Sequence, residues 1–155
     1  MAFVGYALGQ MTMVDRERGN RAAIESSGLT LNEEDIIRVE FSVDSITAQL
    51  TSRLAVSRRP NAILTANNRI TMALLSALQE LDLTIPADIA VVAFDDLPVF
   101  SLLSPPLSAV SQPAYEMGAR CVELLLGQLN GSIQPPFQPA ILQAELKVRK
   151  SSKKI

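Results

Sequence analysis

Residues 59–113 decide the fold class of this chain, and they contain RPNAILTANN (59–68), ADIAVVAFDD (87–96), LPVFSLLSPPL (97–107) and SAVSQP (108–113). Two short runs in this stretch, AILTA and IAVVAF, are apolar at nearly every position. Continuous apolar runs of this length are typical of parallel strands that helices cover on both faces. The stretch therefore predicts two central strands of a parallel sheet.

Polar residues follow each of these strands directly: Asn67 and Asn68 after the first, Asp95 and Asp96 after the second. In an open parallel sheet the carboxyl ends of the strands face the ligand crevice. Two neighbouring strands that deliver amides and carboxylates to one edge therefore indicate half of a small-molecule site.

The rest of the chain alternates between short apolar runs and helical periods, which predicts alternating strands and helices. We expect strands at residues 2–6, 36–41, 62–66, 89–94, 109–112 and 141–148. We expect helices at residues 14–27, 45–57, 69–81 and 114–129, with Asp44 as the N-cap of the second, and a short helical or irregular segment at 97–103. The predicted fold class is α/β, a three-layer sandwich around a parallel sheet of five or six strands.

The composition limits the possible functions. The 155 residues suffice for one domain, 48% of them are hydrophobic, and the apolar runs are too short to span a membrane. A net charge of −2 gives no electrostatic footprint for nucleic acid, and the basic segment 147–154 is predicted to be a solvated terminus. The single cysteine, Cys121, is predicted to be a packed helical thiol.

Several catalytic chemistries lack their residues in this sequence. There is no histidine and only one cysteine, which excludes ordinary zinc sites and Ser-His-Asp or Cys-His catalysis. Neither a GxGxxG motif after the first strand nor a GxxxxGK[ST] phosphate loop is present. We therefore expect a protein that is not an enzyme and that carries no metal or cofactor.

Four side chains are predicted to converge above the sheet: Arg16 from the first helix, and Phe41, Asn67 and Asp95 from the ends of three strands. A guanidinium, an amide and a carboxylate can each bond two neighbouring hydroxyls, and an aromatic ring packs against the C–H face of a sugar. The combination predicts a site for a small polyhydroxylated ligand.

Each of these residues also has a structural interpretation. Asp95 or Asp96 could cap the segment that contains Pro98, and Asn67 or Asn68 could cap the third helix. Arg16 could form a surface pair with Asp15 or Glu17, and Phe41 could belong to the core. The residue pattern does not decide between these structural roles and ligand contact.

The same residues resemble a known family. The segment from RPNAI to SQP, together with VDRERGNRAAIESSGL (14–29) and LQAELKVRKSS (142–152), looks like the ligand-sensing domain of the LacI/GalR family of bacterial transcription regulators. The sequence departs from the family pattern at Asn68, where A-N-D becomes A-N-N, and at Ala93, where V-G-F-D-D becomes V-A-F-D-D. A further departure, at Ser108 and Ala109, changes T-T-V to S-A-V.

The resemblance implies one lobe of a periplasmic-binding-protein-like (type I) fold. It implies that residues 1–112 and a closing strand at 141–149 form the C-terminal lobe, that 113–140 cross to an N-terminal lobe missing from this chain, and that 150–155 are a tail. It also implies a missing DNA-binding head. Carried over by motif, Arg16, Asn67 and Asp95 bind ligand and Phe41 stacks on it, with Thr12 and Gln112 as second-rank candidates lining the cleft.

The resemblance also implies a homodimer. The third helix and the apolar segment 97–103 match the family's dimer surface, and an exposed apolar patch usually marks a contact. The candidate interface residues are Ile70, Leu74, Leu97, Val99, Phe100 and Leu102. Packing of these residues inside the lobe is the alternative.

The leading hypothesis is the effector-sensing part of a cytoplasmic LacI-like repressor, whose effector is a sugar or related metabolite and which contacts DNA only through its head domain. The alternative is a periplasmic sugar-binding protein of a transport system, which shares the fold. A flavodoxin-like enzyme is a third, weaker hypothesis. We also expect the apolar stripe of helix 114–129 to fold back, to swap between chains or to build an oligomer, because bare apolar surface is costly.

Overall fold

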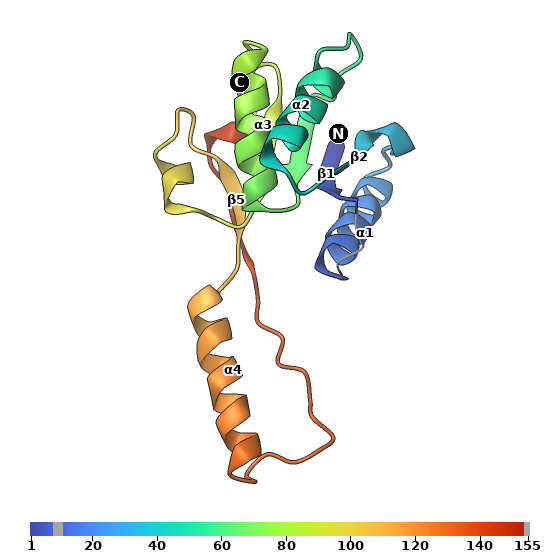
Figure 1. Cartoon of the computed structure of the whole chain (residues 1–155). Helices are drawn as coiled ribbons and strands as arrows, with labels where there is room; N and C mark the ends of the chain where they lie inside the picture. The colour runs from blue at the N-terminus through green and yellow to red at the C-terminus, as the bar shows by residue number, and fades with distance from the viewer. Residues whose placement is uncertain (8–10, 154–155) are drawn as a thin grey trace.

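The computed structural model describes residues 1–7 and 11–153, shown in Figure 1. The strands are β1 (Ala2–Tyr6), β2 (Ile36–Val39), β3 (Ala62–Thr65), β4 (Ala90–Phe94), β5 (Ser108–Ser111) and β6 (Glu145–Lys147). The α-helices are α1 (Met11–Ser26), α2 (Val43–Leu54), α3 (Asn68–Glu80) and α4 (Ala114–Leu129). Short 3-10 helices are η1 (Glu33–Asp35), η2 (Pro98–Ser101) and η3 (Lys150–Ser152).

The strands form one sheet in the order β2-β1-β3-β4-β5-β6. The first five strands pair in parallel, as predicted, so their carboxyl ends share one edge. The last strand differs from the prediction, because β6 is antiparallel to β5 and has three residues rather than the expected eight. The sheet is therefore mixed at one border, and that border is where the chain returns after α4.

Helices α2 and α3 cover one face of the sheet. Their apolar stripes, which include Ile46, Leu50 and Leu74, are fully buried against strand residues such as Ile63 and Val91. Helix α2 begins at Val43 with Ser42 as its N-cap, so the prediction of Asp44 as the cap is wrong.

The opposite face is covered only in part. Helix α1 packs over β1 on this face, burying Met13 and Ile24. Beside it, half-exposed residues of β3, β4 and β5, including Leu64, Val92 and Val110, line a groove of about 380 Å³. The three-layer prediction is therefore met over β1, whereas this groove leaves part of the outer layer open.

Helix α4 stands apart from the sheet as an arm (Figure 1), and residues 130–144 run back beside it to β6. Its bounds match the predicted 114–129, but Gly127 is its only buried residue. Its exposed large apolar residues are Tyr115, Met117, Val122, Leu125, Leu126 and Leu129. Cys121 is exposed, so the prediction of a packed thiol is wrong.

The segment after β6 is packed against the lobe at Ser151, which corrects the prediction of a solvated terminus at 147–154, whereas the tail from residue 150 stays a prediction. Ser151 is fully buried, and its hydroxyl donates to the carbonyl of Val91 at 2.6 Å and accepts from the amide of Ser108 at 2.7 Å. Residues 154–155 lie outside the described residues. Among the described residues, no helix combines the length and apolar character that crossing a bilayer requires.

Candidate functional site

Arg16 reaches the carboxyl edge of the sheet from the second turn of α1. Its guanidinium donates to the carbonyl of Ala66, directly after β3, at 2.5 Å, and lies 4.0 Å from the ring centroid of Phe94 at the end of β4. Burial lowers the pKa of Arg16, and the charge of Asp95 partly opposes that shift. The predicted surface pair is wrong, because Asp15 pairs with Arg18 and Glu17 pairs with Arg21 and Arg38.

Asp95 follows β4 with a left-handed backbone, φ 69°, which L-residues rarely adopt. Its amide donates to the carbonyl of Val110 at 3.0 Å, and its carboxylate accepts a hydrogen bond of 2.5 Å from the side-chain amide of Gln112. A hydrogen bond therefore joins the carboxylate after β4 to the side-chain amide after β5. Gln112 was predicted only as a second-rank residue lining the cleft, and in the structure it is the hydrogen-bond partner of Asp95.

A cavity of about 570 Å³ lies at this end of the molecule, between α1 and the sheet. Its lining includes Thr12, Arg16, Phe94 and Gln112. Asn20 also lines it, with 4% exposure, and neither polar atom of its side chain has a hydrogen-bond partner among the described residues. The cavity thus combines a cation, an aromatic ring and amides with apolar walls, as binding sites for small polar molecules do.

Asn67 acts as the N-cap of α3. Its side-chain oxygen accepts from the amide of Ile70 at 2.9 Å, which confirms the capping alternative. The side chain is half-buried and is not among the residues that line the cavity beside Arg16. Contact between Asn67 and a ligand stays a prediction.

Phe41 lies just beyond β2, with 41% of its surface exposed, so the core alternative is wrong. Its ring stacks on Tyr6, the last residue of β1, with the centroids 4.4 Å apart. An exposed, stacked aromatic pair at the carboxyl edge is compatible with the predicted stacking role. It does not line the cavity that contains Arg16 and Gln112.

A second cavity, of about 410 Å³, lies between α1 and the β1–β2 side of the sheet. Its charged groups already have protein partners: Glu17 accepts from Arg21 and from Arg38 at 2.8 Å, and Arg21 also pairs with Glu33. We therefore place the candidate site at the cavity of Arg16 and Gln112.

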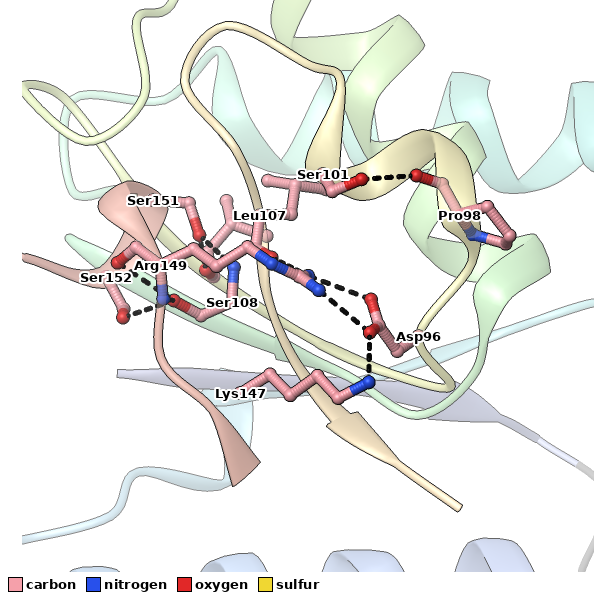
Figure 2. A network of polar contacts seen from close by, with 10 residues as sticks. Asp96, Pro98, Ser101, Leu107, Ser108, Lys147, Arg149, Ser151 and Ser152 are labelled. Carbon is pink, nitrogen blue, oxygen red and sulfur yellow. Dashed lines mark hydrogen bonds and ion pairs between the residues drawn. The ribbon is translucent and has the colours of Figure 1, made fainter. Parts of the chain in front are cut away.

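Asp96 has a different set of partners from Asp95, and the sequence did not distinguish the two. Arg149 donates to both carboxylate oxygens of Asp96 at 2.8 Å, and the ammonium of Lys147 lies 3.2 Å from one of them. Figure 2 shows both cations directed at this carboxylate. Arg149 lowers the pKa of the Asp96 carboxyl, chiefly through these hydrogen bonds. The sequence analysis predicted a solvated terminus for the basic segment and so missed this pairing.

The predicted dimer residues divide into two groups. Ile70, Leu74 and Phe100 have 0% exposure, so the interface prediction is wrong for them and the core alternative is confirmed. Leu97 is partly buried against the core, whereas Val99 and Leu102 are 42% and 82% exposed. An interface through the exposed pair stays a prediction.

Residues 1–152 match the family described as periplasmic binding protein-like domain. A probable opine utilization operon repressor from Rhizobium rhizogenes is 30% identical over 133 residues, which are 84% of this chain and 67% of that protein. A LacI-family regulatory protein from Chloroflexus aggregans superposes with a TM-score of 0.86 at 33% identity, over 98% of this chain and 54% of its own.

A third similar protein was solved with a ligand. The transcriptional regulator CelR, in complex with cellobiose, superposes with a TM-score of 0.87 at 28% identity, over 97% of this chain and 46% of its own. The chain thus spans about half the length of these regulator structures. These three relatives are transcriptional regulators, which favours the regulator hypothesis over a transport protein.

Proposed function

The chain belongs to the LacI family of transcriptional regulators, and from that premise we propose that it senses a small effector, a sugar or related metabolite, for such a regulator. The observation that supports this most is the meeting of Arg16, Asp95 and Gln112 at the carboxyl edge of the sheet. These groups offer fixed donors and acceptors for neighbouring hydroxyls.

The polar groups of the site suit a neutral polyhydroxylated molecule. Arg16 donates, Asp95 accepts, and the amide of Gln112 does both. Two neighbouring hydroxyls of a ligand could therefore insert between Asp95 and Gln112 and replace the hydrogen bond that joins them. The apolar part of the cavity wall, which includes Ala23 and Leu64, would pack against C–H groups. The cellobiose complex of the similar regulator CelR supports a sugar as the first class to test.

In the proposed mechanism the effector bridges this lobe and a second part of the regulator. Its differential affinity for two arrangements of these parts would shift their populations and change DNA binding. DNA contact would come from another part of a full-length regulator acting in the cytoplasm. Dimerisation through the exposed Val99 and Leu102 is part of the proposal. The chain acts as a binding protein and not as an enzyme in this mechanism.

The test is a titration of the 155-residue chain with a panel of sugars that includes cellobiose and D-ribose, followed by amide chemical shifts in NMR. We expect the Gln112 side-chain amide and the Asp95 backbone amide to shift in a saturable way. Arg16→Ala and Asp95→Ala should weaken binding at least about tenfold, which is 1.4 kcal/mol. Unchanged affinity in both variants would show that the site is assigned wrongly.

A further inference from the structure

The orientation of the Asp95 carboxylate depends on a left-handed backbone conformation, and contacts on both sides of the residue tie this turn to neighbouring segments. With φ at 69°, Asp95 lies in the left-handed region, where the Cβ of an L-residue approaches the backbone too closely. On its N-terminal side the turn is tied to β5 by the hydrogen bond from the Asp95 amide to Val110. On its C-terminal side the turn is held through the next residue, Asp96, whose carboxylate binds Arg149.

Asp96 is a mostly buried carboxylate with two cationic partners. Its side chain is 8% exposed, and Arg149 grips it in the bidentate geometry that planar guanidinium groups form with carboxylates. Lys147 adds a third contact from β6 (Figure 2). Two cations therefore neutralise Asp96, so that Asp95 is the aspartate left to interact with Arg16 and with Gln112, which lines the cavity.

Arg149 is also fixed to the strand that leads to Gln112. Its guanidinium donates to the carbonyl of Leu107 at 2.6 Å, and its backbone amide donates to the hydroxyl of Ser108 at 2.7 Å. Ser108 begins β5, and Gln112 directly follows that strand. Arg149 thus contacts both the turn that contains Asp95 and the start of β5, the strand that leads to Gln112.

We propose that Arg149 and Lys147, acting through Asp96, are positioning residues that hold Asp95 and Gln112 in register for the ligand. Neither cation lines the cavity, so both act at one remove from the bound molecule. For its ligand-binding consequence the proposal rests on the proposed function, whereas the positioning itself is a property of the free chain. The competing interpretation is that the ion pairs only anchor the three-residue strand β6 to the sheet edge.

The first experiment needs no ligand. Amide spectra of the free 155-residue chain are compared for Asp96→Asn, Arg149→Lys and Asp95→Asn, with Arg59→Lys as the control, because Arg59 forms an ion pair with Asp88 outside this network. We expect the Gln112 side-chain amide resonances of the first two variants to move towards those of Asp95→Asn. The Asp95 backbone amide should exchange with solvent about tenfold faster in both, and the control should resemble wild type.

Simple anchoring of β6 predicts a different result. The melting temperature would then fall, but the Gln112 and Asp95 resonances and the Asp95 exchange rate would stay at their wild-type values, and this would overturn the proposal. Arg149→Lys keeps the positive charge and loses the planar group that binds both oxygens of Asp96 and the carbonyl of Leu107. It therefore carries the test if Asp96→Asn fails to fold.

The second experiment separates this proposal from the proposed function. Cellobiose is titrated into the wild-type chain, Arg149→Lys and Arg59→Lys. Weaker binding only in Arg149→Lys, by about tenfold or 1.4 kcal/mol, supports positioning, and equal affinity in all three counts against it. If wild type does not bind the sugars of the panel, the proposed function fails, while the ligand-free resonances still decide whether Asp96 and its partners position the site.

Discussion

Adjacent aspartates at the end of β4 have opposite surroundings, although their side chains are chemically identical. Asp95 accepts from a neutral amide and lies in the field of Arg16. Asp96 is buried against two cations. A carboxylate that is saturated by protein cations has little capacity left for a ligand, whereas one that accepts from a neutral amide retains acceptor sites. The geometry therefore favours Asp95 over Asp96 as the proposed ligand acceptor.

The geometry of the Arg16 guanidinium provides a test at the residue scale. Arg16→Lys keeps the charge but removes the planar fork and the stacking on Phe94. We expect affinity for the ligand found in the sugar panel to fall about tenfold, or 1.4 kcal/mol, with little change in thermal stability. Calorimetric titration and a melting curve measure the two effects. Arg18→Lys, on the exposed side of the same helix, should bind as wild type does.

Asn67 allows its capping role to be separated from ligand contact. Asn67→Ala removes the acceptor for the Ile70 amide and should lower the free energy of unfolding by about 1 kcal/mol. Asn67→Asp keeps an oxygen cap, loses the amide hydrogens and adds a negative charge that a helix N-terminus favours, so its stability in urea should not fall below wild type. If Asn67→Asp nevertheless weakens ligand binding, the side chain has a second role and the predicted ligand contact is supported.

At the scale of the elements, local patterns predicted most of the fold. The 3.6-residue stripe of α3 and the continuous apolar runs of β3 and β4 are properties of neighbouring residues, and the structure reproduces them within a residue or two. The order of the parallel strands then brought Arg16 and Asp95 to one edge. This part of the candidate site followed from the sequence because strand ends in a parallel sheet share one side.

Contacts between distant residues were the part that local patterns could not predict. Arg149 lies 53 positions from Asp96, and Ser151 lies 60 positions from Val91. In a local window the basic segment 147–154 is indistinguishable from a solvated terminus. Likewise, the exposure of Phe41 and the burial of Ile70 in the core depend on which elements pack together, and an apolar residue type does not reveal this.

The last segment of the chain should make stability depend on acid pH through Asp96. The fold lowers the pKa of Asp96, so the ion pair contributes its full stability at pH values above the pKa of the unfolded chain, which is about 4. This stability is lost as the pH falls through the pKa of Asp96 in the folded chain. We expect the urea midpoint of wild type to fall more steeply below about pH 4 than that of Asp96→Asn.

The matched control for this pH dependence is Asp15→Asn, which removes a carboxylate from an exposed ion pair with Arg18. Exposed pairs contribute little to stability, so this variant should follow the wild-type pH profile. Parallel profiles for wild type and Asp96→Asn would mean that the bidentate pair with Arg149 is not formed in solution.

At the scale of the whole molecule, two apolar surfaces have no cover within the described chain. One is the groove over β3, β4 and β5, and the other is the stripe on the arm helix α4. Such continuous apolar surface usually marks a contact with another folded unit. The expected folding back of α4 onto the lobe is not observed (Figure 1), which leaves association with another chain as the untested part of that prediction.

The stripe on α4 makes self-association of the 155-residue chain the expected behaviour. Val122, Leu125, Leu126 and Leu129 repeat at helical spacing on one face, each at least half exposed, and burying them between chains gains about 25 cal/mol per Å². Light scattering on serial dilution should show oligomers that dissociate.

The double variant Leu125→Glu with Leu129→Glu should remain monomeric at the same concentrations and keep the wild-type melting temperature at low concentration, because neither side chain supports the monomer core. Gln128→Glu adds a charge off the stripe and should associate as wild type does. A wild-type chain that stays monomeric at all concentrations would show that the bare stripe alone does not drive association.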